Sequence, residues 1–252
     1  ADPSIGFAAL VFAAASLAFF GAWQLGKLFI SKPWVITLMA LGYSLSPQLL
    51  SLKSNLMVVE LLAASMIPWV LFFLIRAITS FNSARAWRWV GLLGLSLALL
   101  ATSSPLAFGL LSVTVLIAAV AKPKRGLILI WSLLPALAVL YPLVKFALEA
   151  QNWTLLTQSS AYASAPTEAF GSFNLVVLCA LALLSLPAWF AADAKTNFGF
   201  FGFAVAAMSL SVIQPLASSA SLTLAAILAL LLLSGLAIER IKQRAISGVV
   251  GV

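Results

Sequence analysis

The sequence predicts an all-α protein: a polytopic transmembrane helical bundle of about nine crossings, with its N-terminus outside and its C-terminus cytoplasmic. Of its 252 residues, 63% are hydrophobic and only 8% are charged, which is too few charges to cover the surface of a soluble domain of this length. The basic residues can nearly all be placed on one side of a membrane, as cytoplasmic connections require. Helices are expected because a helix pairs its backbone polar groups within its own segment.

The crossings follow from the length of the apolar stretches, since about 20 helical residues span a bilayer core. They are 5–26, 33–52, 55–75, two short ones within 89–121, 126–148, 172–192, 197–216 and 220–238. With this layout the following basic residues lie inside: Lys27, Lys32, Arg76, Arg85, Arg88, Lys122, Lys124, Arg125, Lys195, Arg240, Lys242 and Arg244. Only Lys53 and Lys145 lie outside.

Local signals bound the first three crossings. The first ends at Trp23 and Lys27, the second begins at Pro33, and the third stops at Arg76. Indole rings and basic side chains collect where a helix leaves the bilayer, and proline is favoured at the first position of a helix. A polar, basic connection then follows at residues 79–88.

The stretch 89–121 is expected to form a hairpin. As one helix it would be about 50 Å long, against a hydrocarbon core of about 30 Å. Basic residues also flank it on both sides, so a single crossing would place one of the two groups outside. We expect a turn at residues 102–105, where Pro105 restrains its neighbour and removes a donor. Two full crossings and a re-entrant hairpin both remain open.

The later crossings follow from the same reasoning. Residues 126–148 lead into the longest polar segment, 149–171, which has two acids and no base and is therefore expected outside. A short inner turn at Asp193 and Lys195 separates 172–192 from 197–216. The last crossing, 220–238, ends in the charged run that begins at Glu239.

Composition and missing motifs exclude several function classes. The +8 net charge is explained by the inner helix ends, so no nucleic-acid partner is expected. There is no histidine, hence no Ser/His/Asp set, and no glycine-rich phosphate loop or dinucleotide fingerprint. Cys179, the single cysteine, is interpreted as a core residue. No cofactor is expected. Binding of a divalent metal ion remains an open alternative, although no motif favours it.

Glu60 and Lys53 are the first candidate site residues. Glu60 lies inside the third crossing, where charge is costly and faces a cavity or a partner. Lys53 precedes it by seven residues and could share its helix face. Two interpretations remain open: a Lys53–Glu60 pair near the outer interface, or an acid lining an outward-facing cavity. Glu60 is therefore a weak catalytic candidate and Lys53 a weak candidate for holding a lipid phosphate.

The other candidates lie at the outer end of the sixth crossing and in the outer loop. Lys145 could pair with Glu149 four residues later, or hold a lipid phosphate as a point charge. Glu168 is either a solvated loop acid or a second catalytic candidate, as a base near a sugar hydroxyl. Trp153 and Tyr162 could stack on a sugar or anchor the interface.

The order of features resembles a known family. It is carried by residues 26–29 (GKLF), 33–47 (PWVITLMALGYSLSP), the acid-containing third crossing, and 88–105 (RWVGLLGLSLALLATSSP). These resemble the membrane core of glycosyltransferases of the C-type fold that use polyprenyl-phosphate sugars. They are similar in particular to the membrane halves of large actinobacterial glycosyltransferases that carry a family 2 cytoplasmic domain. The resemblance covers about residues 1–148, and the lysine usual in the hairpin turn is absent.

The resemblance implies a membrane module of a glycosyltransferase that uses lipid-linked sugar donors for cell-envelope glycan assembly in the bacterial cytoplasmic membrane. Its partners would be membrane lipids, a polyprenyl-linked sugar and other membrane subunits. In this family the catalytic acid follows the first helix, so it would lie outside this chain. We therefore expect residues 1–252 to be a single transmembrane domain of a longer polypeptide. A non-catalytic scaffold or accessory subunit is the alternative, and a transporter or flippase is the third.

Overall fold

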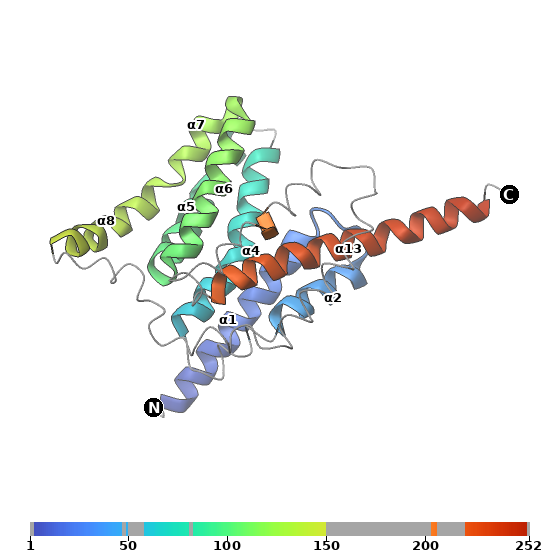
Figure 1. Ribbon diagram of the computed structural model, residues 1–252, viewed down its shortest axis with the longest axis horizontal. Coiled ribbons are helices and arrows are strands. Elements are labelled where there is room, and N and C mark those ends of the chain that lie inside the picture. Colours follow the sequence, from blue (N-terminus) through green and yellow to red (C-terminus); the bar gives the residue numbers. More distant parts are fainter. Residues whose placement is uncertain are drawn as a thin grey trace.

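The computed structural model describes residues 3–46, 49, 58–80, 83–149, 203–205 and 220–250. In these ranges the chain is helical and contains no β-strand, which confirms the all-α prediction for this part of the chain. The helices, shown in Figure 1, are α1 (Pro3–Gly26), α2 (Pro33–Ser44), α4 (Val58–Thr79), α5 (Ser83–Ser103), α6 (Pro105–Ala121), α7 (Pro123–Trp131), α8 (Leu134–Glu149) and α13 (Ala220–Val250).

Four described segments are long and apolar enough to cross a membrane: Ala8–Gly26, Val59–Thr79, Ala84–Ser103 and Pro123–Pro142. Two shorter apolar helices are Pro105–Ala121 and Thr223–Glu239. Large apolar side chains also point outward, among them Phe12 (74% exposed), Leu127 (71%) and Val120 (82%). Such exposure is stable in lipid and costly in water. These features support a helical membrane bundle; the nine crossings and their orientation stay predictions, and 172–192 and most of 197–216 lie outside the described residues.

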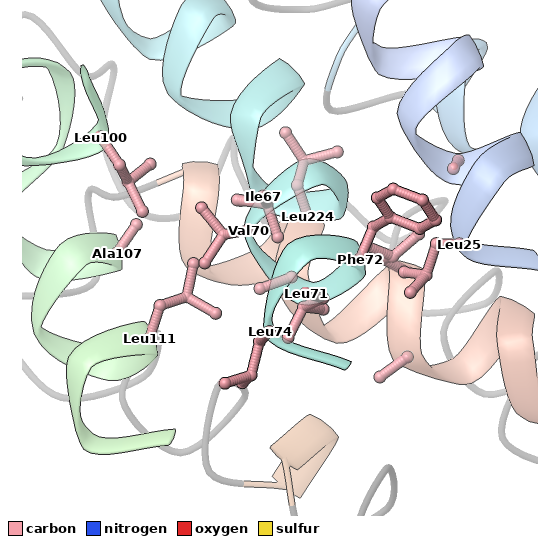
Figure 2. Packing of buried hydrophobic residues seen from close by; sticks show 14 of the residues in the cluster. Leu25, Ile67, Val70, Leu71, Phe72, Leu74, Leu100, Ala107, Leu111 and Leu224 are labelled. Atoms are coloured by element: carbon pink, nitrogen blue, oxygen red, sulfur yellow. The ribbon is translucent and has the colours of Figure 1, made fainter. Parts of the chain in front are cut away.

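The core of the bundle surrounds α4, which packs against α1, α5 and α13. Figure 2 shows Val70 and Leu74 of α4 beside Leu111 of α6, with Leu224 of α13 close to Ile67. Each of these side chains is at most 4% exposed. Because lipid is as apolar as leucine, contact between these helices is stabilised by close packing more than by the hydrophobic effect.

Small residues let α1 approach α4. Ala14, Ala18 and Ala22 repeat at four-residue spacing and are fully buried, which is the small-residue pattern that brings membrane helices close. Next to this stripe, a Cβ on Gly21 would lie 2.8 Å from Nε1 of Trp69. That indole nitrogen donates a hydrogen bond to the carbonyl of Leu17 at 3.0 Å. The contact therefore combines a close backbone approach with a polar link between the two helices.

Aromatic rings join α4 to α5. Phe73 and Trp89 stack with ring centroids 6.0 Å apart, and Phe72 meets Trp89 edge-on at 6.0 Å. Trp69 packs against both phenylalanines. Because only residues 80–82 separate the two helices, they run antiparallel. This contact fixes which residues of α4 and α5 lie at the same height.

The turn predicted at residues 102–105 is confirmed. Between α5 and α6, Ser104 is extended, and its Oγ accepts a hydrogen bond from the amide of Ala107. Pro105 occupies the first position of α6, where its missing N–H leaves no helical bond unmade. At the far end of α6, Nη1 of Arg125 donates to the carbonyl of Ala77 at 2.9 Å. The chain thus returns to the end of the bundle at which α4 finishes.

The crossing predicted at 126–148 overlaps the candidate span Pro123–Pro142, and its helix is interrupted near the middle. α7 ends at Trp131 and α8 begins at Leu134. Pro135 lacks the N–H that would bond to the carbonyl of Trp131, which favours a break at this position. The break is buried against α5, where a Cβ on Gly94 would lie 3.0 Å from the carbonyl oxygen of Ser132. A larger residue than glycine at position 94 would require the backbone at Ser132 or the ring of Pro135 to shift by a few tenths of an ångström.

Two further helices differ in length from their predicted ranges. α2 ends at Ser44 instead of continuing to residue 52, and Leu45 leaves the helical conformation at φ −106° and ψ 11°. Pro47 follows shortly and disfavours helix at the residue before it. α2 has 12 residues, about 18 Å of helix, which is shorter than a bilayer core. α13, in contrast, continues through the charged run to Val250 and extends beyond the other helices in Figure 1.

Candidate functional site

Glu60 lies on the first turn of α4 and is 5% exposed. Its neighbours Leu61, Ala63 and Ala64 are buried apolar residues. Glu60 and Lys145 each interact with another group. A carboxylate inside an apolar bundle is costly, so it is retained where it binds something or orders its surroundings. The expectation of an acid inside this helix therefore agrees with the position of Glu60.

The height of Glu60 in the bundle follows from the contact between Phe73 and Trp89. Glu60 and Thr102 are each about 20 Å of helix away from that contact, and α4 and α5 run antiparallel. Glu60 therefore lies level with the turn between α5 and α6. Arg76 is on the last turn of the same helix, about 24 Å from Glu60 along the axis. The acid and the basic connections occupy opposite ends of the bundle.

Tyr43 fixes the helical turn that follows Glu60. Its side chain is fully buried, and its hydroxyl donates a hydrogen bond to the carbonyl of Ala64 at 2.6 Å. Pro68 lies four residues later inside α4, and it has no N–H with which to bond that carbonyl. The hydroxyl of Tyr43 takes the place of the missing donor, so α2 holds the proline-containing part of α4.

The other predicted site residues are not gathered around Glu60 in the described part of the chain. Lys145 is exposed and lies near the end of α8, a helix that packs on α5. Figure 1 shows α8 diverging from α13 and α2. Lys53, Trp153, Tyr162 and Glu168 lie outside the described residues, as does the side chain of Glu149. A cleft shared by Lys53, Glu60, Lys145 and Glu168 stays a prediction.

Glu239 is a structural residue that the sequence analysis missed. It is 7% exposed, and each of its carboxylate oxygens accepts a hydrogen bond of 3.1 Å from the amide of Ser31. The hydroxyl of Ser31 donates to Oε1 as well. These bonds attach α13 to the connection between α1 and α2. One signal could have revealed it: Glu239 follows the buried Leu232 and Leu236 at helical spacing, so it extends a buried face.

Two other charged residues have partners that spacing alone did not indicate. Arg125 bonds to Ala77, as described above, and Nζ of Lys27 lies 3.4 Å from the ring centroid of Trp23. Their sequence positions marked both residues only as indicators of the inner side of the membrane. In the structure each also makes a specific contact, because a basic side chain at a helix end can reach a carbonyl or an aromatic face.

Cofactor binding has no support from the side chains that the structure describes. Among them, no three His, Cys, Asp or Glu residues gather to hold a metal ion. Comparison with models of protein families, with curated proteins and with solved structures gives no match for this chain.

Proposed function

We propose that this chain is the membrane module of a glycosyltransferase that uses polyprenyl-phosphate-linked sugars for envelope glycan assembly in the bacterial cytoplasmic membrane. The observation that carries the proposal is Glu60, a carboxylate buried to 95% in an apolar bundle, at the end opposite the basic connections. The order of apolar helices, acid and short hairpin, which resembles the membrane core of such enzymes, supports it further.

The proposed chemistry takes place at the end of the bundle that holds Glu60. An acceptor hydroxyl attacks the anomeric carbon of the donor sugar, the bond from that carbon to the phosphate oxygen breaks, and the lipid phosphate leaves with the electron pair. The hydroxyl proton passes to a carboxylate, for which Glu60 and Glu168 are the candidates in this chain. Lys53 and Lys145 are the candidates for holding the lipid phosphate, and Trp153 and Tyr162 for contacting the sugar.

The outward-facing apolar side chains suit the lipid part of such a donor. Leu95 is 61% exposed and Leu99 is 56% exposed, and both lie on the half of α5 that leads to the height of Glu60. A polyprenyl chain could lie along this face while its phosphate stays at the interface.

The test uses the native full-length protein reconstituted in vesicles with a fluorescent acceptor and polyprenyl-phosphate sugars. We expect transfer by the wild type and a loss of about a hundredfold or more in Glu60→Gln, the range for removing an acid–base group. Glu239→Gln is the matched control, because it removes a buried carboxylate from another helix and should retain transfer. If the wild-type protein neither binds nor uses these donors, the glycosyltransferase proposal is wrong and the scaffold alternative is favoured.

A further inference from the structure

The basic residues at the end of α4 and at the starts of α5 and α7 form one surface, which we call the basic rim. It consists of Arg76, Arg85, Arg88, Lys122 and Lys124, all exposed. The bond from Arg125 to Ala77 ties the start of α7 to the last turn of α4, and α7 also packs against α5. Cations that are up to 48 residues apart along the chain are therefore neighbours in space.

Two helices of the basic rim, α5 and α7, continue as outward-facing apolar stripes. On α5, Arg88 is followed on the same face by Leu92, Leu95 and Leu99, which are 37%, 61% and 56% exposed. On α7, Lys124 is followed by Leu127 and Trp131, which are 71% and 52% exposed. The spacings of three and four residues place each cation directly at the end of its stripe.

This arrangement fixes the level of the cations relative to a bilayer. Exposed apolar stripes face the acyl chains, and half-exposed indoles such as that of Trp87 (49% exposed) prefer the interface. The charged ends of Arg88 and Lys124 then lie at the height of the lipid phosphates. Arginine can bind phosphate oxygens with two parallel hydrogen bonds, and lysine binds them as a point charge.

The carboxylates that the structure describes leave this charge uncompensated. Glu60 is at the other end of α4, and Glu239 bonds to Ser31 of the connection between α1 and α2. Arg76 does contact the ring of Phe72, with its Cζ 5.5 Å from the centroid, which keeps its positive charge. The basic rim is thus a cationic surface bordered by lipid-facing side chains.

We propose that the basic rim binds anionic phospholipid headgroups, with the acyl chains lying along the stripes of α5 and α7. A zwitterionic lipid carries no net negative charge to pair with the cations. A free phosphate ion has no acyl chain that could contact the apolar stripes. Clusters of basic residues at the cytoplasmic ends of membrane helices attract anionic lipids in this way. The inference does not rest on the proposed glycosyltransferase function, since the cations lie at the end of the bundle opposite Glu60; the two proposals share only Leu95 and Leu99, which face lipid in both.

The experiment measures tryptophan fluorescence of the full-length protein in phosphatidylcholine vesicles that contain brominated phosphatidylglycerol or, for comparison, brominated phosphatidylcholine. Trp87 is exposed at the basic rim and Trp131 on the stripe of α7 that leads away from it, so a brominated lipid bound there quenches them. We expect stronger quenching by phosphatidylglycerol at equal fractions, and a loss of this preference at high salt. Equal quenching by both lipids would overturn the proposal.

Variants locate the binding surface. At about fivefold in affinity per cation, Arg88→Gln with Lys124→Gln should lower the preference for phosphatidylglycerol about tenfold or more. Lys27→Gln with Lys32→Gln removes the same number of charges elsewhere and should retain the preference, as should the charge-conserving pair Arg88→Lys with Lys124→Arg. Equal losses in the first two pairs would overturn the proposal.

Two further results keep the proposal testable. If the double variant Arg88→Gln with Lys124→Gln does not fold, two other measurements test the proposal. These are the salt dependence of quenching in the wild type and the lipid preference of the charge-conserving pair. Inorganic phosphate, added at the ionic strength of a sodium chloride control, should displace no more lipid than the chloride does. Specific displacement by phosphate would assign the basic rim to a soluble ligand and overturn the lipid proposal.

Discussion

The hydroxyl of Tyr43 donates to the carbonyl oxygen of Ala64 at 2.6 Å, and this is the carbonyl whose helical donor is missing because Pro68 has no N–H. A proline inside a membrane helix is tolerated when a neighbouring helix satisfies the freed backbone group. Here α2 does so, one turn after Glu60. The short helix α2 therefore determines whether α4 can stay continuous and hold its buried acid.

This relationship predicts a coupled effect of two substitutions. Tyr43→Phe removes only the hydroxyl and should lower the free energy of unfolding in detergent by about 1–2 kcal/mol, because a buried carbonyl loses its partner. Pro68→Ala restores an N–H that can bond to Ala64. In the Pro68→Ala background, Tyr43→Phe should lower the free energy of unfolding by clearly less than in the wild type. Equal costs in both backgrounds, measured by denaturant titration, would show that the hydroxyl does not substitute for the missing donor.

A second prediction concerns the contact between α1 and α4. Gly21→Leu places a side chain where Trp69 Nε1 and Pro68 Cγ lie 2.8 and 2.9 Å from the new Cβ. Overpacking at such a site should lower the free energy of unfolding by about 1–3 kcal/mol. Gly6→Leu is the matched control on the same helix, since nothing lies within 4 Å of its Cβ. Thermal unfolding should separate the two variants, and equal midpoints would contradict the close approach.

The attachment of α13 gives a third prediction. Glu239→Ala leaves the amide and hydroxyl of Ser31 without their acceptor and should cost about 1.5–3 kcal/mol of stability, as expected for hydrogen bonds to a charged group. Ser31→Ala keeps the amide and should cost less. Proteolysis of the purified protein supplies a second readout, because release of α13 would expose its buried face. Unchanged stability in Glu239→Ala would contradict this account of the residue.

The break between α7 and α8 gives a fourth prediction. Gly94→Ala introduces a Cβ at 3.0 Å from the carbonyl oxygen of Ser132 and 3.1 Å from Cγ of Pro135. We expect a lower unfolding midpoint for this variant, corresponding to about 1 kcal/mol, since the backbone of α7 has to shift. Gly91→Ala on the same helix meets nothing within 4 Å and should be neutral or slightly stabilising. The reverse order of the two midpoints would be evidence against this packing.

Signals confined to a few neighbouring residues predicted local structure well. The turn at residues 102–105 combines a serine cap with Pro105 at the first helical position, and both act within one turn. The helix 55–75 was predicted close to the observed Val58–Thr79, because its apolar length and Arg76 are also local signals. The acid inside this helix was identified from the same stretch of sequence.

Features that depend on distant partners were not predictable. Pro68 and Pro135 look alike in sequence, yet α4 continues while the chain breaks before Pro135. The difference lies in Tyr43, which replaces a donor for Ala64, and in Gly94, which admits the bend at Ser132. Glu239 bonds to a residue 208 positions away. The charged run at the end of α13 therefore did not indicate which residue Glu239 contacts.

The two ends of the bundle, one with Glu60 and one with the basic rim, are predicted to face opposite sides of a membrane. Thr102 and Lys124 are both exposed, and α6 separates them. With Cys179→Ala as background, cysteines introduced at Thr102 and at Lys124 would be labelled in intact cells with a membrane-impermeant maleimide. We expect labelling of Thr102→Cys from outside and of Lys124→Cys only after the membrane is permeabilised. Labelling of both from the same side would contradict the arrangement that places Glu60 outside and the basic rim inside.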